Sequence, residues 1–458
     1  MGVRTLAYIV TECRENAQQG SATQKLVIQH GGREVTAYER QFGPLPTLGL
    51  CAAFGYSRFG LFAAVGNPMQ RLGISLDGSM VAFEVTDDHS IWTPLPPEVA
   101  VPPEEEGFFV VQADGSGLRR VGDASREPCA RLALDPTSPL GMNARSDCWR
   151  VFFSPDGGKI AFTDLGPDDT GQEATQIFTL DLQTHKRTQV THLAPLPPPG
   201  PVAPTVEQGS FADADTLWFA TNTMTDGSYW STVKADGTAK PTPNVPRLPP
   251  VAVEGAQLTP ELRITEPARS ILWFPQLGTP VNNIPLVAPT IWELFVERGE
   301  LLLQLTAFRR SDTGGAAWLD VDEQRVVFTA SANPLGTNPD ENCQLFSIDS
   351  LGGDLRQLTQ WGEGQHSLGG CASQLRPGCG ITFGYIAEQQ GPDTDMFYST
   401  CDPLGTNPDG GQVFTVRSDG TGLRQLTHTR GVVTEADGTV TVELPGPYGA
   451  LWDIEGGD

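Results

Sequence analysis

The sequence predicts an all-β fold made of seven repeated antiparallel sheets, and three observations lead to this prediction. A pattern of short apolar strands recurs along the whole chain. Asp-Gly turns separate many of these strands, because glycine takes the positive φ that such turns require. A strand is missing from the first repeat, and an orphan strand ends the chain. Four short strands per unit in a repeated array are typical of a β-propeller, here with seven blades.

The clearest repeat lies near the C-terminus. It has a strand at 396–399, a second strand at 412–416, a turn at 418–422 and the ending Leu-Arg-Gln-Leu-Thr at 423–427. Two more units follow this order well, and weaker copies fill the rest of the chain. The approximate units are residues 1–40 with 447–458, 70–122, 148–193, 209–243, 268–307, 316–360 and 380–428.

Several units carry a further strand that ends in a tight turn, and Phe152–Gly158 is the clearest example. The first unit lacks this strand. We therefore expect the C-terminal strand at 448–453 to pair with the N-terminal unit, so that no long sheet edge stays exposed.

The segment Ser154–Phe162, together with the Leu-Arg-Gln-Leu-Thr endings, resembles the TolB-like or WD40-like (PD40) β-propeller repeat. The resemblance covers nearly the whole chain and is clearest in the third, sixth and seventh units. Propellers of this kind serve as scaffolds, receptors and recognition domains. For TolB-like proteins the resemblance implies protein–protein interaction in a cell envelope or at a surface.

Each unit has about 65 residues, against about 40–45 in a plain repeat. We expect the extra residues between the second and third strands and between units, which places them on one face, the expected working surface. Prolines in the connectors at 94–103, 194–204 and 241–250 indicate stiff, extended chain. The apolar connector 38–69 either plugs the central channel or binds a partner, and the candidate contact residues are Leu50, Phe54, Phe59 and Phe62.

Two loops are nearly identical, Asn333–Asp340 and Asp402–Asp409. Asparagine and aspartate oxygens on a tight loop are ligands that Ca²⁺ accepts. The same side chains also form Asx turns that only fix a loop. The sequence leaves both interpretations open, and the candidate Ca²⁺ ligands are Asn338, Asp340, Asn407 and Asp409.

The chain has eight cysteines, almost all in predicted connectors, which favours disulfides and an oxidising compartment. The expected pairs are Cys371–Cys379, Cys129–Cys148, Cys13–Cys51 and Cys343–Cys401. We expect a periplasmic, cell-surface or secreted protein whose signal peptide has been removed from the start of this chain.

The net charge of −25 disfavours binding to nucleic acids or anionic membranes. No stretch of sequence predicts a membrane span, and no nucleophile-elbow, zincin or phosphate-loop motif occurs. Three histidines each follow the last strand of a unit, namely His192, His366 and His428. Seven-bladed oligogalacturonate lyases of this repeat class use a histidine-rich manganese site in such a place.

The sequence therefore predicts an exported, non-catalytic β-propeller that binds a protein or a surface polymer through its loop-rich face. The alternative is a metal-dependent, carbohydrate-active enzyme that uses the three histidines.

Overall fold

The computed structural model describes most of the chain, with gaps in several connectors. The described residues are 4–16, 19–45, 69–86, 104–126, 130–133, 143–146, 151–194, 208–223, 227–244, 263–266, 271–277, 290–298, 301–308, 314–319, 324–339, 341, 344–360, 381–382, 394–399, 404 and 412–453. These residues form strands, turns and loops and contain no helix. Accordingly, no helix long and apolar enough to cross a membrane occurs in the described part of the chain.

The described strands form one five-stranded sheet, six four-stranded sheets and one two-stranded sheet, in which neighbouring strands run antiparallel. The five-stranded sheet has the order β3–β2–β1–β31–β30, built from β1 (Arg4–Glu15), β2 (Gly20–His30), β3 (Arg33–Leu45), β30 (Gly431–Thr434) and β31 (Val440–Asp453). The two-stranded sheet pairs β8 (Ala130–Ala133) with β9 (Asn143–Ser146).

Each four-stranded sheet keeps its strands in chain order. The first three are β4 (Met69–Ile74), β5 (Met80–Val85), β6 (Gly107–Gln112) and β7 (Arg119–Gly122); β10 (Phe152–Phe153), β11 (Lys159–Pro167), β12 (Glu173–Asp181) and β13 (Arg187–Gln189); and β14 (Gln208–Asp213), β15 (Thr216–Thr223), β16 (Gly227–Lys234) and β17 (Thr242–Asn244). The last three are β18 (Arg263–Glu266), β19 (Ile271–Leu277), β20 (Thr290–Arg298) and β21 (Leu301–Gln304); β22 (Gly314–Leu319), β23 (Arg325–Ala330), β24 (Gln344–Asp349) and β25 (Arg356–Gln357); and β26 (Ile381–Thr382), β27 (Thr394–Ser399), β28 (Gln412–Arg417) and β29 (Arg424–Gln425).

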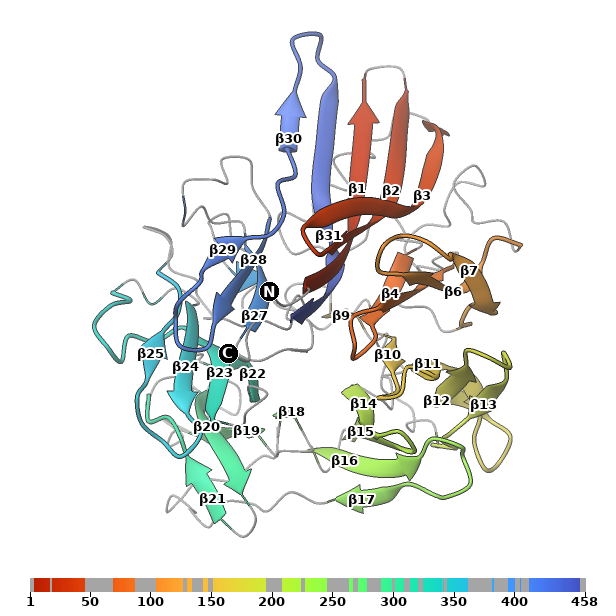
Figure 1. Ribbon diagram of the computed structural model, residues 1–458. Helices are drawn as coiled ribbons and strands as arrows, with labels where there is room; N and C mark the ends of the chain where they lie inside the picture. Colours follow the sequence, from red (N-terminus) through yellow and green to blue (C-terminus); the bar gives the residue numbers. More distant parts are fainter. Residues whose placement is uncertain are drawn as a thin grey trace.

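The sheets lie around a common centre, as in a propeller (Figure 1). The first strand of a four-stranded sheet lies toward the centre and the last strand toward the outside, as β10 and β13 show. The five-stranded sheet extends beyond this ring at the top of the view. The all-β, propeller-like arrangement predicted from the repeats is therefore present.

Apolar residues from neighbouring sheets form the core between them. Phe108 of β6 and Phe162 of β11, for example, are fully buried in one cluster, with ring centroids 4.2 Å apart. Phe414 of β28 packs in the same way with Val327 and Leu345 of the preceding sheet. Because strand residues alternate between two faces, a sheet can present an apolar face to each of its two neighbours, as the sheet β10–β13 does.

The last strand of the chain pairs with the first. β31 runs antiparallel to β1 from Arg4 opposite Asp453 to Glu15 opposite Val440, with one irregularity between Tyr8 and Val10. The expected pairing of the strand at 448–453 with the N-terminal sheet is thus present. β31 is, however, about twice as long as expected, and β30 adds a hairpin to it that the repeat pattern did not predict.

Aspartates fix most of the tight turns by accepting backbone hydrogen bonds. In the turn between β10 and β11, Asp156 accepts from the N–H of Gly158 at 3.1 Å and from the hydroxyl of Ser154 at 2.6 Å. These two bonds, the hydroxyl first, hold the pKa of the Asp156 carboxyl below its usual range. The same bond to the N–H two residues later recurs at Asp77, Asp114, Asp168, Asp181, Asp213, Asp236, Asp419 and Asp437.

The expected insertion between second and third strands is wrong for two of the four-stranded sheets. In one of them, only residues 224–226 separate β15 from β16. In the other, the hairpin of β11 and β12 replaces it. β11 and β12 continue as a long hairpin that turns within residues 168–172, because Asp168 accepts bonds from the N–H groups of Thr170 and Gln172 at 2.8 Å each. A turn fixed by one carboxylate leaves no room for a long loop there.

Deletion of residues 447–458 should destabilise the whole protein by several kcal/mol, because it removes the partners of Thr5 through Tyr8 on β1. Denaturant unfolding measures the free energy of unfolding of this deletion variant. A variant that lacks only residues 454–458, which lie beyond β31, is the control. Equal stability of wild type and the longer deletion would contradict it.

Loss of the Asp156 charge should destabilise the protein in a pH-dependent way. Since its folded-state pKa lies below the ordinary 3.8, ionised Asp156 adds stability above that value, and this is lost as the pH falls through the folded-state pKa. We expect Asp156→Asn to lower the melting temperature at about pH 7, and we expect the difference from wild type to narrow as the pH falls below 3.8. A difference that stays the same size as the pH falls below 3.8 would argue against this role of the charge.

Candidate functional site

The sheets have two differently built ends. The first–second and third–fourth strand connections lie at one end of the sheets, where Asp-centred turns such as those of Asp156 and Asp181 occur, and we call that end the turn face. The opposite end, which carries the second–third connections and the connectors between sheets, is the loop-bearing face. Both twin loops lie on the loop-bearing face, one between β23 and β24 and the other between β27 and β28.

The first twin loop is described through Pro339, and its own asparagines hold it in shape. The side-chain oxygen of Asn333 accepts from the N–H of Asn338 at 2.8 Å, and the Asn338 amide donates to the carbonyl of Ala332 at 2.9 Å. Asn338 is buried at 3% exposure, and the Thr337 hydroxyl donates to Gln357 of β25 at 2.6 Å. The side chains of Asn333 and Asn338 therefore form loop-fixing bonds.

Each twin loop presents a leucine to solvent at the same position in its sequence. Leu335 is 44% exposed and Leu404 is 43% exposed. Their sheets are neighbours that are tied together, since the Ser347 hydroxyl donates to the carbonyl of Ser418 at 2.6 Å. The two leucines thus stand on adjacent, mutually fixed sheets on the loop-bearing face.

Most of the other residues singled out in the sequence lie outside the described part of the chain. They are Leu50, Phe54, Phe59 and Phe62, the loop residues Asp340, Asn407 and Asp409, the histidine His366, and the cysteines Cys51, Cys129, Cys148, Cys343, Cys371, Cys379 and Cys401. Cys13 is described and disulfide-bonded, and its partner is one of those seven cysteines. The pairing Cys13–Cys51 stays a prediction.

The repeated Gln-Leu-Thr ending has a structural role that the sequence did not indicate. In the last sheet, the Thr427 hydroxyl donates to the Gln412 side chain at 2.7 Å and accepts from the N–H of Val413 at 2.9 Å. Gln425 donates to the carbonyl of Thr427 at 2.6 Å. The same buried glutamine–threonine bond joins Gln176 with Thr191 and Gln344 with Thr359, and we call it the Gln–Thr latch.

Two of the three candidate metal-binding histidines contact the glutamine that stands two residues before a latch threonine. His192 is exposed, with its Nδ1 3.0 Å from the amide of Gln189, and His428 lies in the same way 3.2 Å from Gln425. Strands β13 and β29, which they follow, lie on opposite sides of the molecule (Figure 1). The structure does not bring His192 and His428 together. No group of three or more His, Cys, Asp or Glu side chains placed to hold a metal occurs among the described residues.

A buried polar network between two sheets was missed by the sequence analysis. Arg71 of β4 and Glu84 of β5 form a fully buried ion pair, with Nε and Oε2 2.8 Å apart. The Arg71 guanidinium also donates to Thr163 of β11 at 3.2 Å and to Ser125 at 3.1 Å. Glu84, a charged residue within the apolar run 81–85, was the feature of the sequence that could have indicated a buried ion pair.

The network continues to the outer strand of the next sheet. Asp164 of β11 is fully buried and accepts hydrogen bonds from Arg187 and from the N–H of Arg126. The Arg187 guanidinium lies 4.3 Å from the ring centroid of Phe178. Burial, followed by the nearby charges of Arg126 and Arg71, lowers the pKa of Arg187 to about 10. Positive charges are therefore crowded here, in a chain whose net charge is −25.

No family model matches the chain, and no curated protein sequence matches it. Among solved structures, the β-propeller domain of the Trilobed protease from Pyrococcus furiosus matches 85% of this chain and 93% of its own, at 10% identity and a TM-score of 0.41. An oligogalacturonate lyase in complex with manganese matches 76% of this chain and 78% of its own, at 10% identity and a TM-score of 0.39. A putative TolB from Agrobacterium tumefaciens matches 67% of this chain and 93% of its own, at 11% identity and a TM-score of 0.34.

Acylaminoacyl peptidase and prolyl endopeptidase structures also match, and this chain spans about half the length of each. All of these TM-scores lie below 0.5, so the fold is assigned from the chain's own sheets.

Thr427→Val should destabilise the protein by about 1–3 kcal/mol, because it leaves Gln412 and the N–H of Val413 buried without their hydroxyl partner. Denaturant unfolding measures the change. Thr434→Val, at an exposed position of β30, is the matched control. A loss of stability no larger than that of the control would show that the latch does not contribute.

Proposed function

We propose that the chain is a TolB-like, seven-bladed β-propeller that acts outside the cytoplasm and binds a protein partner through its loop-bearing face. The six four-stranded sheets and the five-stranded sheet that joins both chain ends support the seven blades. The resemblance of the segment 154–162 to the TolB-like repeat supports the kind of propeller.

The observation that carries the binding function is the pair of exposed leucines on the twin loops. A loop whose shape is fixed by its own side chains loses little conformational entropy on binding. The first twin loop is such a loop, and Leu335 and Leu404 add apolar area at equivalent positions of the two twin-loop sequences. Exposed leucines at equivalent positions on two neighbouring sheets suit the recognition of a folded protein surface.

The disulfide at Cys13 supports export, because disulfides persist in oxidising compartments. The negative charge of the chain supports a protein partner over a nucleic acid. A binding role at a cell envelope or surface is consistent with both.

The double substitution Leu335→Ser/Leu404→Ser should abolish capture of the partner without changing the melting temperature. The reason is that both side chains face solvent in the isolated chain. Affinity capture from an envelope extract of the source organism, followed by quantitative mass spectrometry, measures this.

Leu351→Ser is the matched control, because Leu351 is 71% exposed on the turn face. The proposal requires a protein that wild type and Leu351→Ser both retain and that the double variant loses. Retention of the same proteins by all three would refute a binding role for the twin loops.

A further inference from the structure

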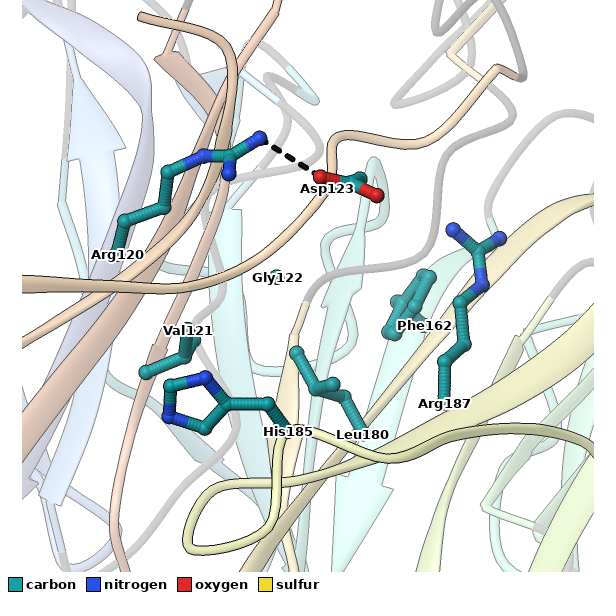
Figure 2. A pocket seen from close by; sticks show the side chains of 8 residues that line it. All are labelled: Arg120, Val121, Gly122, Asp123, Phe162, Leu180, His185 and Arg187. Carbon is teal, nitrogen blue, oxygen red and sulfur yellow. Dashed lines mark hydrogen bonds and ion pairs between the residues drawn. The ribbon is translucent and has the colours of Figure 1, made fainter. Parts of the chain in front are cut away.

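A pocket lies between the outer strands β7 and β13, away from the twin loops. Its volume is about 310 Å³, within the range of small-ligand sites. Figure 2 shows Arg120 and Arg187 on two sides of the pocket, Asp123 between them, Phe162 beside Arg187, and Leu180 and Val121 below. His185 lies at the opposite edge, with its backbone in the left-handed region at φ 60°.

The pocket occurs where these two sheets depart from the repeat. Arg120 pairs with Phe109 at the position that Gln357 and Gln425 occupy opposite their phenylalanines. Gly122 stands two residues later, where other sheets carry the latch threonine. Places where one copy of a repeat departs from the others are expected to serve function.

The second departure is on the facing strand. Arg187 stands two residues before Gln189, at the position of Leu355 and Leu423 in their Leu-Arg-Gln-Leu-Thr endings. Asp164, its buried partner, likewise stands two residues after Phe162, where Ala330 follows Phe328. Where the other sheets carry an alanine and a leucine, this sheet carries an aspartate and an arginine, which bring a guanidinium to the pocket.

Only some of the guanidinium nitrogens of Arg120 and Arg187 donate hydrogen bonds to described protein atoms. Arg120 donates through Nε to the carbonyl of Glu106 and through Nη2 to Asp123, each at 2.8 Å, and Arg187 donates through Nη2 to Asp164. Within the described part of the chain, the Nη1 atoms of both arginines donate no hydrogen bond to protein. Asp123 is 86% exposed, so a ligand can displace its carboxylate from Arg120 at little cost.

We propose that this pocket binds a small anion that carries a carboxylate or a phosphate. Arg120 and Arg187 would bind the anionic group through charge-assisted hydrogen bonds, which are stronger than hydrogen bonds between neutral groups. Phe162, Leu180 and Val121 are buried, so they form the fixed base of the pocket beneath the two guanidinium groups. The site is separate from the proposed partner-binding surface and does not depend on it.

Isothermal titration of the full chain with phenyl phosphate and with benzoate tests the proposal, with benzyl alcohol as the neutral probe. We expect saturable binding of at least one anion and none of the alcohol, and the tighter anion distinguishes a phosphate from a carboxylate ligand. Arg120→Gln restores the residue of the other sheets and should weaken binding by about ten- to a hundredfold. Asp123→Asn removes the competing carboxylate and should tighten it.

Arg356→Gln is the matched control, because both Arg120 and Arg356 are 42% exposed and paired with an aspartate. The double variant Asp164→Ala/Arg187→Leu restores the repeat on the facing strand and should also weaken binding. The melting curve of the double variant shows whether it folds. If the double variant does not fold, the affinity of Arg120→Gln alone tests the proposal. Equal binding of benzyl alcohol and the anions, or unchanged affinity in both Arg120→Gln and Asp123→Asn, would overturn the proposal.

Discussion

The pairing of β1 with β31 is the interaction on which the arrangement of the other sheets depends. A sheet with two apolar faces is stable only when a neighbour covers each face. For the first and last sheets of the chain, this requires the two chain ends to meet. β31 supplies that contact through hydrogen bonds along nearly the whole of β1, and Leu6 and Tyr8 of β1 then pack with Val413 and Leu426 of the preceding sheet.

The repeated parts of the protein and its variable parts have separate roles. Among the described residues, Asp-centred turns hold one end of several sheets, and in three sheets the Gln–Thr latch holds the last strand against the third near the other end. With the backbone fixed in this way, the second–third connections can vary in length without disturbing the core. The twin loops and the inter-sheet pocket are both places where the sequence adds to the repeat or departs from it.

The fold could be predicted largely from the sequence, because the alternation of apolar residues and the Asp-Gly turns encode strands and hairpins locally. The β30–β31 hairpin was not predicted although Asp437-Gly438 lies between valine-rich strands, because this turn stands outside the repeated pattern. The ion pair of Arg71 and Glu84 could not be placed, because it depends on how two sheets face each other. For the same reason the sequence grouped His192 with His428, which the structure keeps on separate sheets.

The central claim is that a folded protein contacts the loop-bearing face, and site-specific photo-crosslinking tests it most directly. A photoreactive phenylalanine analogue would replace Leu335 in one sample and Leu351, on the turn face, in another. The account predicts one discrete crosslinked protein from position 335 and none from position 351 under the same illumination. Crosslinks to the same protein from both positions, or only from position 351, would contradict it.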